Sequence, residues 1–184
     1  MPKQVKILIT GSPATGKRSV ASLICKRTMC KCISINEIAS AVPHVTYRNE
    51  IVLNRSAVKR RLRSEVSGIN SYVIYGNLAW EVVPKDLIDV VVVLRCNPLV
   101  LYQRYRQRGY DEEKSKDNVV AEAIGLVYHE CLKSFGPMVE VIDVTYESLE
   151  RIVDRILGGK FDNPSSIDWL ELASRDQNLL RLLL

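Results

Sequence analysis

Apolar residues along the chain fall into blocks with two different spacings. Five blocks are nearly continuous apolar runs, which is typical of strands covered on both faces of a sheet. The strands predicted from these runs are residues 5–10, 32–35, 72–75, 89–95 and 139–144. Between them, apolar residues recur every three or four positions, as on the buried face of a helix. The alternation predicts an α/β fold with a doubly wound, three-layer parallel sheet of five strands.

The helices between these strands are predicted from caps and stop signals. They are a helix after residue 16, a short one over 37–41 capped by Asn36, one over 56–66 capped by Ser56, one over 98–108, a long one ended by Gly136–Pro137, and one over 149–157. The long helix is expected to carry Val120, Ile124, Val127 and Cys131 on one stripe, after a charged segment over 110–118. Residues 42–55 are expected to be irregular.

The last part of the chain is rich in leucine. Ser165 to Asp168 resembles a capping box that leads into Trp169. So much apolar surface is not expected to stay in water. We expect residues 159–184 to form a helical tail that docks on the body of the protein; the alternative is a surface for a partner or a second copy.

Length and charge narrow the class of protein. The 184 residues suffice for one domain, here 1–158, with its own core. The net charge of +5, from 26 Lys and Arg against 21 Asp and Glu, permits a nucleic-acid partner but does not require one. The sequence has no secretory signal and no apolar run of about 18 residues that would cross a membrane. We therefore expect a cytoplasmic protein without a membrane partner.

The five cysteines are scattered, and none forms a Cys-x-x-Cys pair. The two histidines, His44 and His129, lie apart from any cysteine cluster. This pattern argues against a zinc site. We interpret the cysteines as small hydrophobic residues in a reducing compartment.

Residues 11–19, Gly-Ser-Pro-Ala-Thr-Gly-Lys-Arg-Ser, follow the first predicted strand and open the first predicted helix. A strand, Gly-x-x-x-x-Gly-Lys and a helix form a phosphate-binding P-loop. Gly11 and Gly16 allow the tight turn that aims several N–H groups at one anion, and the helix adds its positive end. Lys17 supplies an ammonium group for the outer phosphates of a nucleoside triphosphate.

One position of this motif departs from the common pattern. The residue after the lysine, which is usually Ser or Thr and ligates Mg²⁺, is Arg18. Adenylate-kinase-like enzymes commonly have this hydroxyl one place later, where this chain has Ser19. Ser19 is therefore the candidate ligand for Mg²⁺.

Arginines at strand ends and on closing segments stabilise the charge of a transferring phosphoryl group. Arg95 ends the valine-rich strand and is expected to point into the cleft. Arg108 precedes Gly109, which frees the backbone for movement, and is expected to act from a lid. Arg104 and Arg106 are interpreted as a solvated helix face.

The combination of motifs resembles a known family. The residues concerned are 94–98 (Leu-Arg-Cys-Asn-Pro), 101–102 (Leu-Tyr), 108–110 (Arg-Gly-Tyr) and Asn118 before a helix that contains Glu, together with the P-loop. They resemble the atypical adenylate kinases related to the coilin-interacting nuclear ATPase and its archaeal relatives, over residues 1 to about 158.

This resemblance implies a P-loop nucleoside-monophosphate-kinase-like fold with an NMP-binding segment near 36–57 and a lid near 108–118. It implies ATP contacts at Ala14, Gly16, Lys17, Arg18, Ser19 and Arg108. It also implies adenylate kinase and ATPase activity on ATP and AMP. The partner it implies is a ribosomal protein, in maturation of the small ribosomal subunit.

Two departures from the family pattern bear on catalysis. Where the family has Asp-x-His after its third strand, this chain has Tyr75-Gly76-Asn77, and a phenol does not replace a carboxylate in ordering hydrated Mg²⁺. Ala14 replaces a loop glycine, and Glu81 is either a substitute charge or a surface residue. Two functions stay open: a working ATP:AMP phosphotransferase or ATPase, and a catalytically weakened, nucleotide-gated binding factor.

A basic helix is the remaining feature. Five cations lie within nine residues: Arg55, Lys59, Arg60, Arg61 and Arg63. The alternatives are a solvated face, a contact with ribosomal RNA, or a grip on the NMP phosphate, for which Arg48 also competes.

Overall fold

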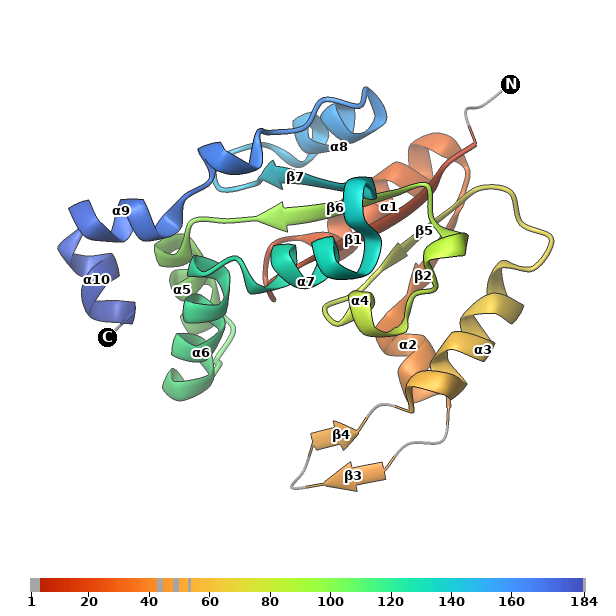
Figure 1. Ribbon diagram of the computed structural model, residues 1–184, viewed down its shortest axis with the longest axis horizontal. Coiled ribbons are helices and arrows are strands. Elements are labelled where there is room, and N and C mark those ends of the chain that lie inside the picture. Colours follow the sequence, from red (N-terminus) through yellow and green to blue (C-terminus); the bar gives the residue numbers. More distant parts are fainter. Residues whose placement is uncertain (1–3, 43–44, 48–49, 53, 184) are drawn as a thin grey trace.

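The structure, a computed structural model, describes residues 4–42, 45–47, 50–52 and 54–183. A parallel sheet of five strands in the order β2-β5-β1-β6-β7 forms its centre (Figure 1). The strands are β1 (Lys6–Gly11), β2 (Lys31–Ser34), β5 (Tyr72–Tyr75), β6 (Val90–Arg95) and β7 (Val139–Asp143). The predicted fold class is confirmed, and the P-loop follows the central strand, at the edge where open α/β sheets bind ligands.

Helices cover both faces of the sheet because alternate residues of each strand point to opposite sides. Leu8, Ile74 and Val93 pack on one side in a core cluster with α2 (Ile35–Ser40), α3 (Arg55–Val66), α4 (Ala79–Val82) and α7 (Leu126–Phe135). Ile9, Val92 and Leu94 pack on the other side with α1 (Lys17–Thr28), α5 (Pro98–Gln107) and α8 (Leu149–Leu157). Both faces are dry, which explains the continuous apolar runs of the strands.

Two predicted helix caps are wrong by two residues. The N-cap of α2 is Ser34, whose side chain accepts a hydrogen bond from the N–H of Glu37, and not Asn36. The N-cap of α3 is Asn54, whose side chain accepts from the N–H of Ala57, and not Ser56. In each case an earlier polar side chain already satisfies the free N–H groups of the first turn.

The single long helix predicted before Gly136 is also wrong. Asp111 caps α6 (Glu112–Ala123), so most of the charged segment 110–118 is helical. Gly125 then adopts a left-handed conformation, with φ 65°, and α7 starts in a new direction. As a result the predicted stripe is broken, and Ile124 is 47% exposed.

Residues 42–55, expected to be irregular, contain a short antiparallel pair, β3 (Val45–Tyr47) and β4 (Glu50–Val52). Figure 1 shows this pair beyond α2 and α3, away from the sheet. It occupies the segment in which the family resemblance places the NMP site.

The C-terminal segment docks on the body of the protein. A short 3₁₀ turn at Pro164–Ser166 leads into α9 (Trp169–Arg175), which Asp168 caps, and then α10 (Gln177–Leu183). Trp169 and Leu179 are buried, and α10 packs against α5 and α6 (Figure 1). Two further 3₁₀ turns lie at Lys85–Leu87 and Gly136–Met138. None of the helices in the described ranges is long and apolar enough to span a membrane.

Candidate nucleotide-binding site

The P-loop is shaped by the close approach of two strands. Gly11 has φ +143°, and a Cβ atom at this position would lie 2.4 Å from the carbonyl oxygen of Leu94 on β6. No other residue type fits there, because that oxygen belongs to the neighbouring backbone. Gly16, also with a positive φ, precedes the first residue of α1, Lys17. The loop therefore leads directly into α1, and the N–H groups of the first helical turn, which no side chain caps, can bind an anion.

Ala14 stands in a conformation that favours glycine. Its φ is 62°, in the left-handed region. A side chain in this region costs roughly 1–2 kcal/mol. The loop therefore keeps the backbone shape that a glycine would adopt, at the expense of some strain.

Lys17 is folded over the inside of the loop. Its Nζ donates to the carbonyl oxygens of Gly11, at 2.8 Å, and Ser12, at 2.7 Å. The pKa of Lys17 is lowered to about 7, chiefly by burial; Glu122 opposes this lowering and the nearby Arg108 adds to it. An anion in front of the loop would favour the charged ammonium, so nucleotide binding and protonation of Lys17 are linked.

A cleft of about 410 Å³ opens in front of the loop. Its walls come from the P-loop, the carboxyl ends of β2 and β5, and the segment after α5. Ala14, Gly16, Lys17, Arg18, Ser19 and Arg108 all line it, together with Pro13, Ser34, Asn36, Tyr75, Gly76, Asn77 and Tyr110. The structure thus brings together the residues predicted to contact ATP, except Gly11, which shapes the loop from behind.

Arg18 lies on the open side of this cleft. It is 3.7 Å from Glu37, and both side chains are largely exposed. Hydrogen bonding to Tyr75 raises the pKa of Arg18. Tyr75 therefore interacts with a cation at the position where the family resemblance expects a carboxylate.

The prediction for Arg95 is wrong. Its side chain is 5% exposed, is absent from the lining of the cleft, and donates from Nε to Glu122 at 2.7 Å. Its Nη2 donates to the backbone carbonyl of Glu122 at 2.9 Å. The guanidinium group therefore holds β6 to α6 behind the P-loop and does not point into the cleft where a phosphate would bind.

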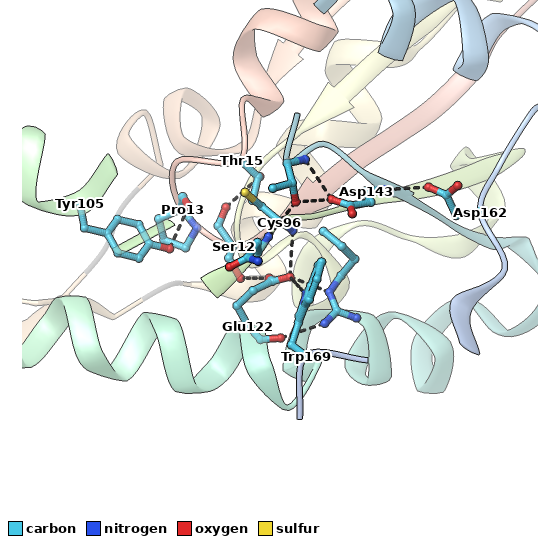
Figure 2. Close-up of polar contacts among 12 residues, drawn as sticks. Ser12, Pro13, Thr15, Cys96, Tyr105, Glu122, Asp143, Asp162 and Trp169 are labelled. Carbon is cyan, nitrogen blue, oxygen red and sulfur yellow. Dashed lines mark hydrogen bonds and ion pairs between the residues drawn. The ribbon is translucent and has the colours of Figure 1, made fainter. Parts of the chain in front are cut away.

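Glu122 is the functional candidate that the sequence did not single out. It is 1% exposed, and Figure 2 shows it at the meeting point of the P-loop, the end of β6 and the C-terminal segment. Its only sequence signal is an acidic residue between Val119 and Ala123, which both proved buried on α6. An acidic residue within an apolar helical face is expected to be buried beside a group of opposite charge.

Residues of α5 hold the P-loop from outside. Arg104 is half-buried and donates to the carbonyl oxygen of Ala14 at 3.2 Å, which corrects its interpretation as part of a solvated face. The Tyr105 hydroxyl donates to the carbonyl oxygen of Pro13 at 3.0 Å (Figure 2). Arg106 is exposed, as expected for that face.

The cleft does not fit a magnesium ion held by the protein. Mg²⁺ is usually bound through one or two carboxylates in addition to substrate phosphates. None of the described residues that line the cleft is acidic, and Ser19 offers a single hydroxyl. Glu81, a possible substitute, pairs with Arg55 at 2.8 Å instead.

The basic helix is α3, and three of its arginines are paired with acids. Arg55 pairs with Glu81, Arg61 with Glu65 and Arg63 with Asp86. Among the described residues, Lys59 and Arg60 form no such pair, and both are exposed. Arg48, the competing candidate for an NMP phosphate, lies outside the described residues.

The cysteines fit their interpretation only in part. Cys96 and Cys131 are buried and separate. Cys30 is half-buried and Cys32 exposed, and the Sγ atom of Cys30 lies 2.8 Å from that of the buried Cys25. This contact could not be predicted from the sequence, because it depends on the turn between α1 and β2.

Sequence comparisons agree with this geometry. The model of a protein family described as "AAA domain" matches residues 7–125. The "putative adenylate kinase" of Archaeoglobus fulgidus is 33% identical over 186 residues, covering 95% of this chain and 98% of that protein. The protein of the same name from Methanosarcina barkeri is 30% identical over 181 residues, covering 89% of this chain and 97% of that protein.

Solved structures show the same fold at low sequence identity. A gluconokinase from Sinorhizobium meliloti superposes with a TM-score of 0.54 at 15% identity, over 86% of this chain and 93% of that one. A shikimate kinase from Bacteroides thetaiotaomicron gives a TM-score of 0.56 at 15% identity, over 84% and 96%. At this identity the likeness concerns the fold alone.

Proposed function

Because the chain belongs to the P-loop family of kinase-like nucleotide-binding proteins that includes the archaeal adenylate kinase relatives, we propose that it is an ATP:AMP phosphotransferase. In this reaction an oxygen of the AMP phosphate attacks the γ-phosphorus of ATP, the bond to the β–γ bridging oxygen breaks, and two molecules of ADP result. The same site would hydrolyse ATP when water takes the place of AMP.

The observation that carries the proposal is the convergence of three cations on one cleft. Lys17, Arg18 and Arg108 line it together, and none of the described lining residues is acidic; Glu37, which lies 3.7 Å from Arg18, is outside the lining. Phosphoryl transfer depends on positioning and on stabilisation of the charge that spreads over the transferring oxygens. In the proposed reaction Lys17 would hold the outer phosphates against the start of α1, and Arg108, which also lines the cleft, would neutralise charge on the transferring group.

The segment after α5 supports a closing role for Arg108. Gly109 has φ +72°, and Asp111, two residues later, caps α6. Tyr110 lies between them, lines the cleft and stacks on Tyr105 with ring centroids 5.4 Å apart. Arg108 therefore stands on a short turn between two helices, where a small backbone change would move its side chain.

The direct test is a coupled assay of ADP formation with ATP alone and with ATP plus AMP, each with Mg²⁺ and with a chelator. We expect AMP-dependent ADP formation that Arg108→Ala lowers about 1,000-fold, at the lower end of the range of about 10³–10⁵ for arginines that stabilise this transition state. Arg106→Ala, an exposed arginine on α5, is the matched control and should keep the wild-type rate. ATP binding without any ADP formation would contradict the proposal.

A second function is favoured by Tyr75 and by the absence of a carboxylate from the described cleft lining. We propose it as the alternative: a nucleotide-gated factor in small ribosomal subunit maturation, acting in the cytoplasm through a ribosomal protein and ribosomal RNA. In this function, ATP binding would change the affinity for the particle and turnover would be slow. The family resemblance supports this role, and Lys59 and Arg60 are the cations of α3 that, among the described residues, form no ion pair and could contact RNA.

This alternative predicts a salt-dependent association with small-subunit particles. Reversing both charges, Lys59→Glu with Arg60→Glu, should weaken binding and reduce the salt slope by about two units, because each neutralised phosphate releases counterions. ATP affinity should not change. If the double variant damages AMP binding and spares particle binding, α3 serves the NMP site; no effect on either would leave α3 as a solvated face.

A further inference from the structure

One buried carboxylate joins the P-loop to the C-terminal segment. Oε2 of Glu122 accepts a hydrogen bond from the Ser12 hydroxyl at 2.5 Å. Its Oε1 accepts from Arg95 Nε at 2.7 Å, from the N–H of Cys96 at 3.1 Å and from Trp169 Nε1 at 3.3 Å. Four donors from three separate parts of the chain therefore meet on one side chain (Figure 2).

The Ser12 end of this network belongs to the nucleotide site. The Ser12 carbonyl oxygen accepts from Lys17 Nζ at 2.7 Å and from the Thr15 hydroxyl at 2.9 Å. A displacement of Ser12 would move the acceptor that holds the Lys17 ammonium inside the loop. Glu122 is thus connected through a single residue, Ser12, to the Lys17 ammonium that would contact the phosphates.

The Trp169 end belongs to a docked segment. Trp169 is 9% exposed and begins α9, and the α10 helix that follows packs against α5 and α6. These two helices flank Arg108, so the C-terminal segment contacts the body both at the Glu122 network and at the helices on either side of Arg108. The carboxylate of Glu122 therefore contacts both the C-terminal segment and the P-loop.

We propose that Glu122 is a positioning residue of the nucleotide site and that it makes docking of the C-terminal segment and binding of nucleotide interdependent. The proposal rests on nucleotide binding at the P-loop but not on phosphotransfer. By linkage, nucleotide binding strengthens the docking as much as docking strengthens nucleotide binding.

The test is a double-mutant cycle on ATP affinity, measured by calorimetry. Trp169→Phe keeps an aromatic ring and removes only the N–H donor; we expect it to raise the Kd for ATP about three- to tenfold, as for one net hydrogen bond. In a Ser12→Ala background, where Glu122 no longer contacts the loop, the same change should have less than about a twofold effect. Trp80→Phe, a half-buried tryptophan on α4, is the matched control and should leave the Kd unchanged.

A second readout uses the same control. In the Trp80→Phe variant Trp169 is the only tryptophan, so its fluorescence should change on titration with ATP and saturate at the calorimetric Kd. Equal effects of Trp169→Phe in both backgrounds, or loss of thermal stability with an unchanged Kd, would overturn the coupling. A wild-type protein that does not bind ATP would instead contradict the nucleotide site itself.

A separate observation concerns the turn between α1 and β2. The Sγ atoms of Cys25 and Cys30 lie 2.8 Å apart, and a disulfide requires about 2.05 Å. The hydrogen bond between the two thiols lowers the pKa of Cys30 to about 6, and together with burial it raises the pKa of Cys25. Cys30 is half-buried and is thus a partly accessible thiolate at neutral pH, the form that reacts with oxidants. No group of three metal-ligating residues occurs in the described part of the chain, so a metal does not account for the pair.

The geometry points to an oxidation site at which peroxide converts Cys25 and Cys30 into a disulfide. The Cys30 thiolate attacks one peroxide oxygen, the O–O bond breaks, and a sulfenic acid and hydroxide form. The Cys25 sulfur then attacks the Cys30 sulfur, the S–O bond breaks, and water leaves with the Cys25 proton. Two electrons pass from the two thiols to hydrogen peroxide, which ends as two waters.

Trypsin separates the three neighbouring cysteines, because Lys26, Arg27 and Lys31 lie between them. After treatment with stoichiometric hydrogen peroxide, we expect a loss of about 2 Da and a cross-link between peptides 19–26 and 28–31. Cys30→Ser should abolish the cross-link and Cys131→Ser should not. A cross-link to Cys32, a disulfide between two chains, or gain of oxygen without a cross-link would overturn the proposal.

Discussion

The two sides of the P-loop treat charge in opposite ways. In front, Lys17, Arg18 and Arg108 line the cleft, none of the described lining residues is acidic, and the exposed Glu37 lies 3.7 Å from Arg18 outside that lining. Behind, Glu122 is buried, and its charge is matched by Arg95 and three further donors. The comparison shows two electrostatic arrangements around one loop. The cations that line the cleft can be neutralised by bound phosphates. Behind the loop, the Glu122 carboxylate is fully hydrogen-bonded, and these bonds keep the loop in shape.

The largest effect is expected from breaking the buried ion pair between Glu122 and Arg95 behind the loop. Glu122→Gln keeps the shape and removes the charge that compensates the buried Arg95. We expect a loss of about 3–5 kcal/mol in the free energy of unfolding, as for a buried ion pair that loses one partner. Urea denaturation measures it, with the exposed Glu150→Gln as control within about 0.5 kcal/mol. A loss below about 1 kcal/mol would show that Arg95 finds another partner.

The second largest effect is expected from removing Lys17 from the cleft in front of the loop. Lys17→Ala should weaken ATP binding about 100-fold, because a charge-assisted contact to the outer phosphates contributes about 1.5–3 kcal/mol. Lys26→Ala, an exposed lysine at the other end of α1, should bind ATP as the wild type does. Calorimetry distinguishes the two, and unchanged affinity in Lys17→Ala would contradict the site assignment.

The pH dependence of binding sharpens the same point. Because the pKa of Lys17 is lowered to about 7, the lysine is neutral above that pH in the free protein, and bound phosphates must restore its proton. Between pH 7.5 and 9, ATP affinity should fall about tenfold per pH unit, with uptake of about one proton per complex. Calorimetry in buffers with different ionisation enthalpies measures the uptake. Lys17→Arg stays charged and should lose this dependence.

Adding a carboxylate to the open side tests why that side lacks one. Tyr75→Asp should weaken binding of ATP in a chelator, because the new charge repels the phosphates. It should also raise Mg²⁺-dependent ADP formation about tenfold, equivalent to about 1.4 kcal/mol of barrier. Tyr146→Asp, at a tyrosine that is 85% exposed, is the control. A wild-type turnover already in the range of about 1–100 s⁻¹ typical of kinases would show that the chain does not need the carboxylate.

The smallest effect is expected from the loop backbone. Ala14→Gly should relieve the left-handed strain and raise the free energy of unfolding by about 1 kcal/mol. Thermal and urea unfolding measure this gain. Ala21→Gly, on the buried face of α1, should lower stability, since that position is helical. Destabilisation by both changes would mean that the Ala14 methyl packs more favourably than its conformation costs.

The sheet and the P-loop could be predicted because both depend on local patterns: apolar runs, and glycines at fixed spacing. The direction of Arg95 could not, since it depends on Glu122, which lies 27 residues later on another element. The sequence does not reveal the break at Gly125, because the apolar residues keep helical spacing across it. It does not single out Asp111 as a cap, because Asp111 stands in a run of charged residues.

The register of the central strand has a consequence for folding. Lys6 of β1 pairs with Tyr72 of β5, and Ile7 pairs with Val90 of β6, so both neighbours of β1 come from distant parts of the chain. Long loops must close before β1 gains either neighbour, and folds built on such distant pairs assemble slowly. The contact of Gly11 with Leu94 belongs to the β1–β6 pairing. In refolding from urea, the capacity to bind nucleotide should therefore return in the slowest phase, after most of the helical circular dichroism signal.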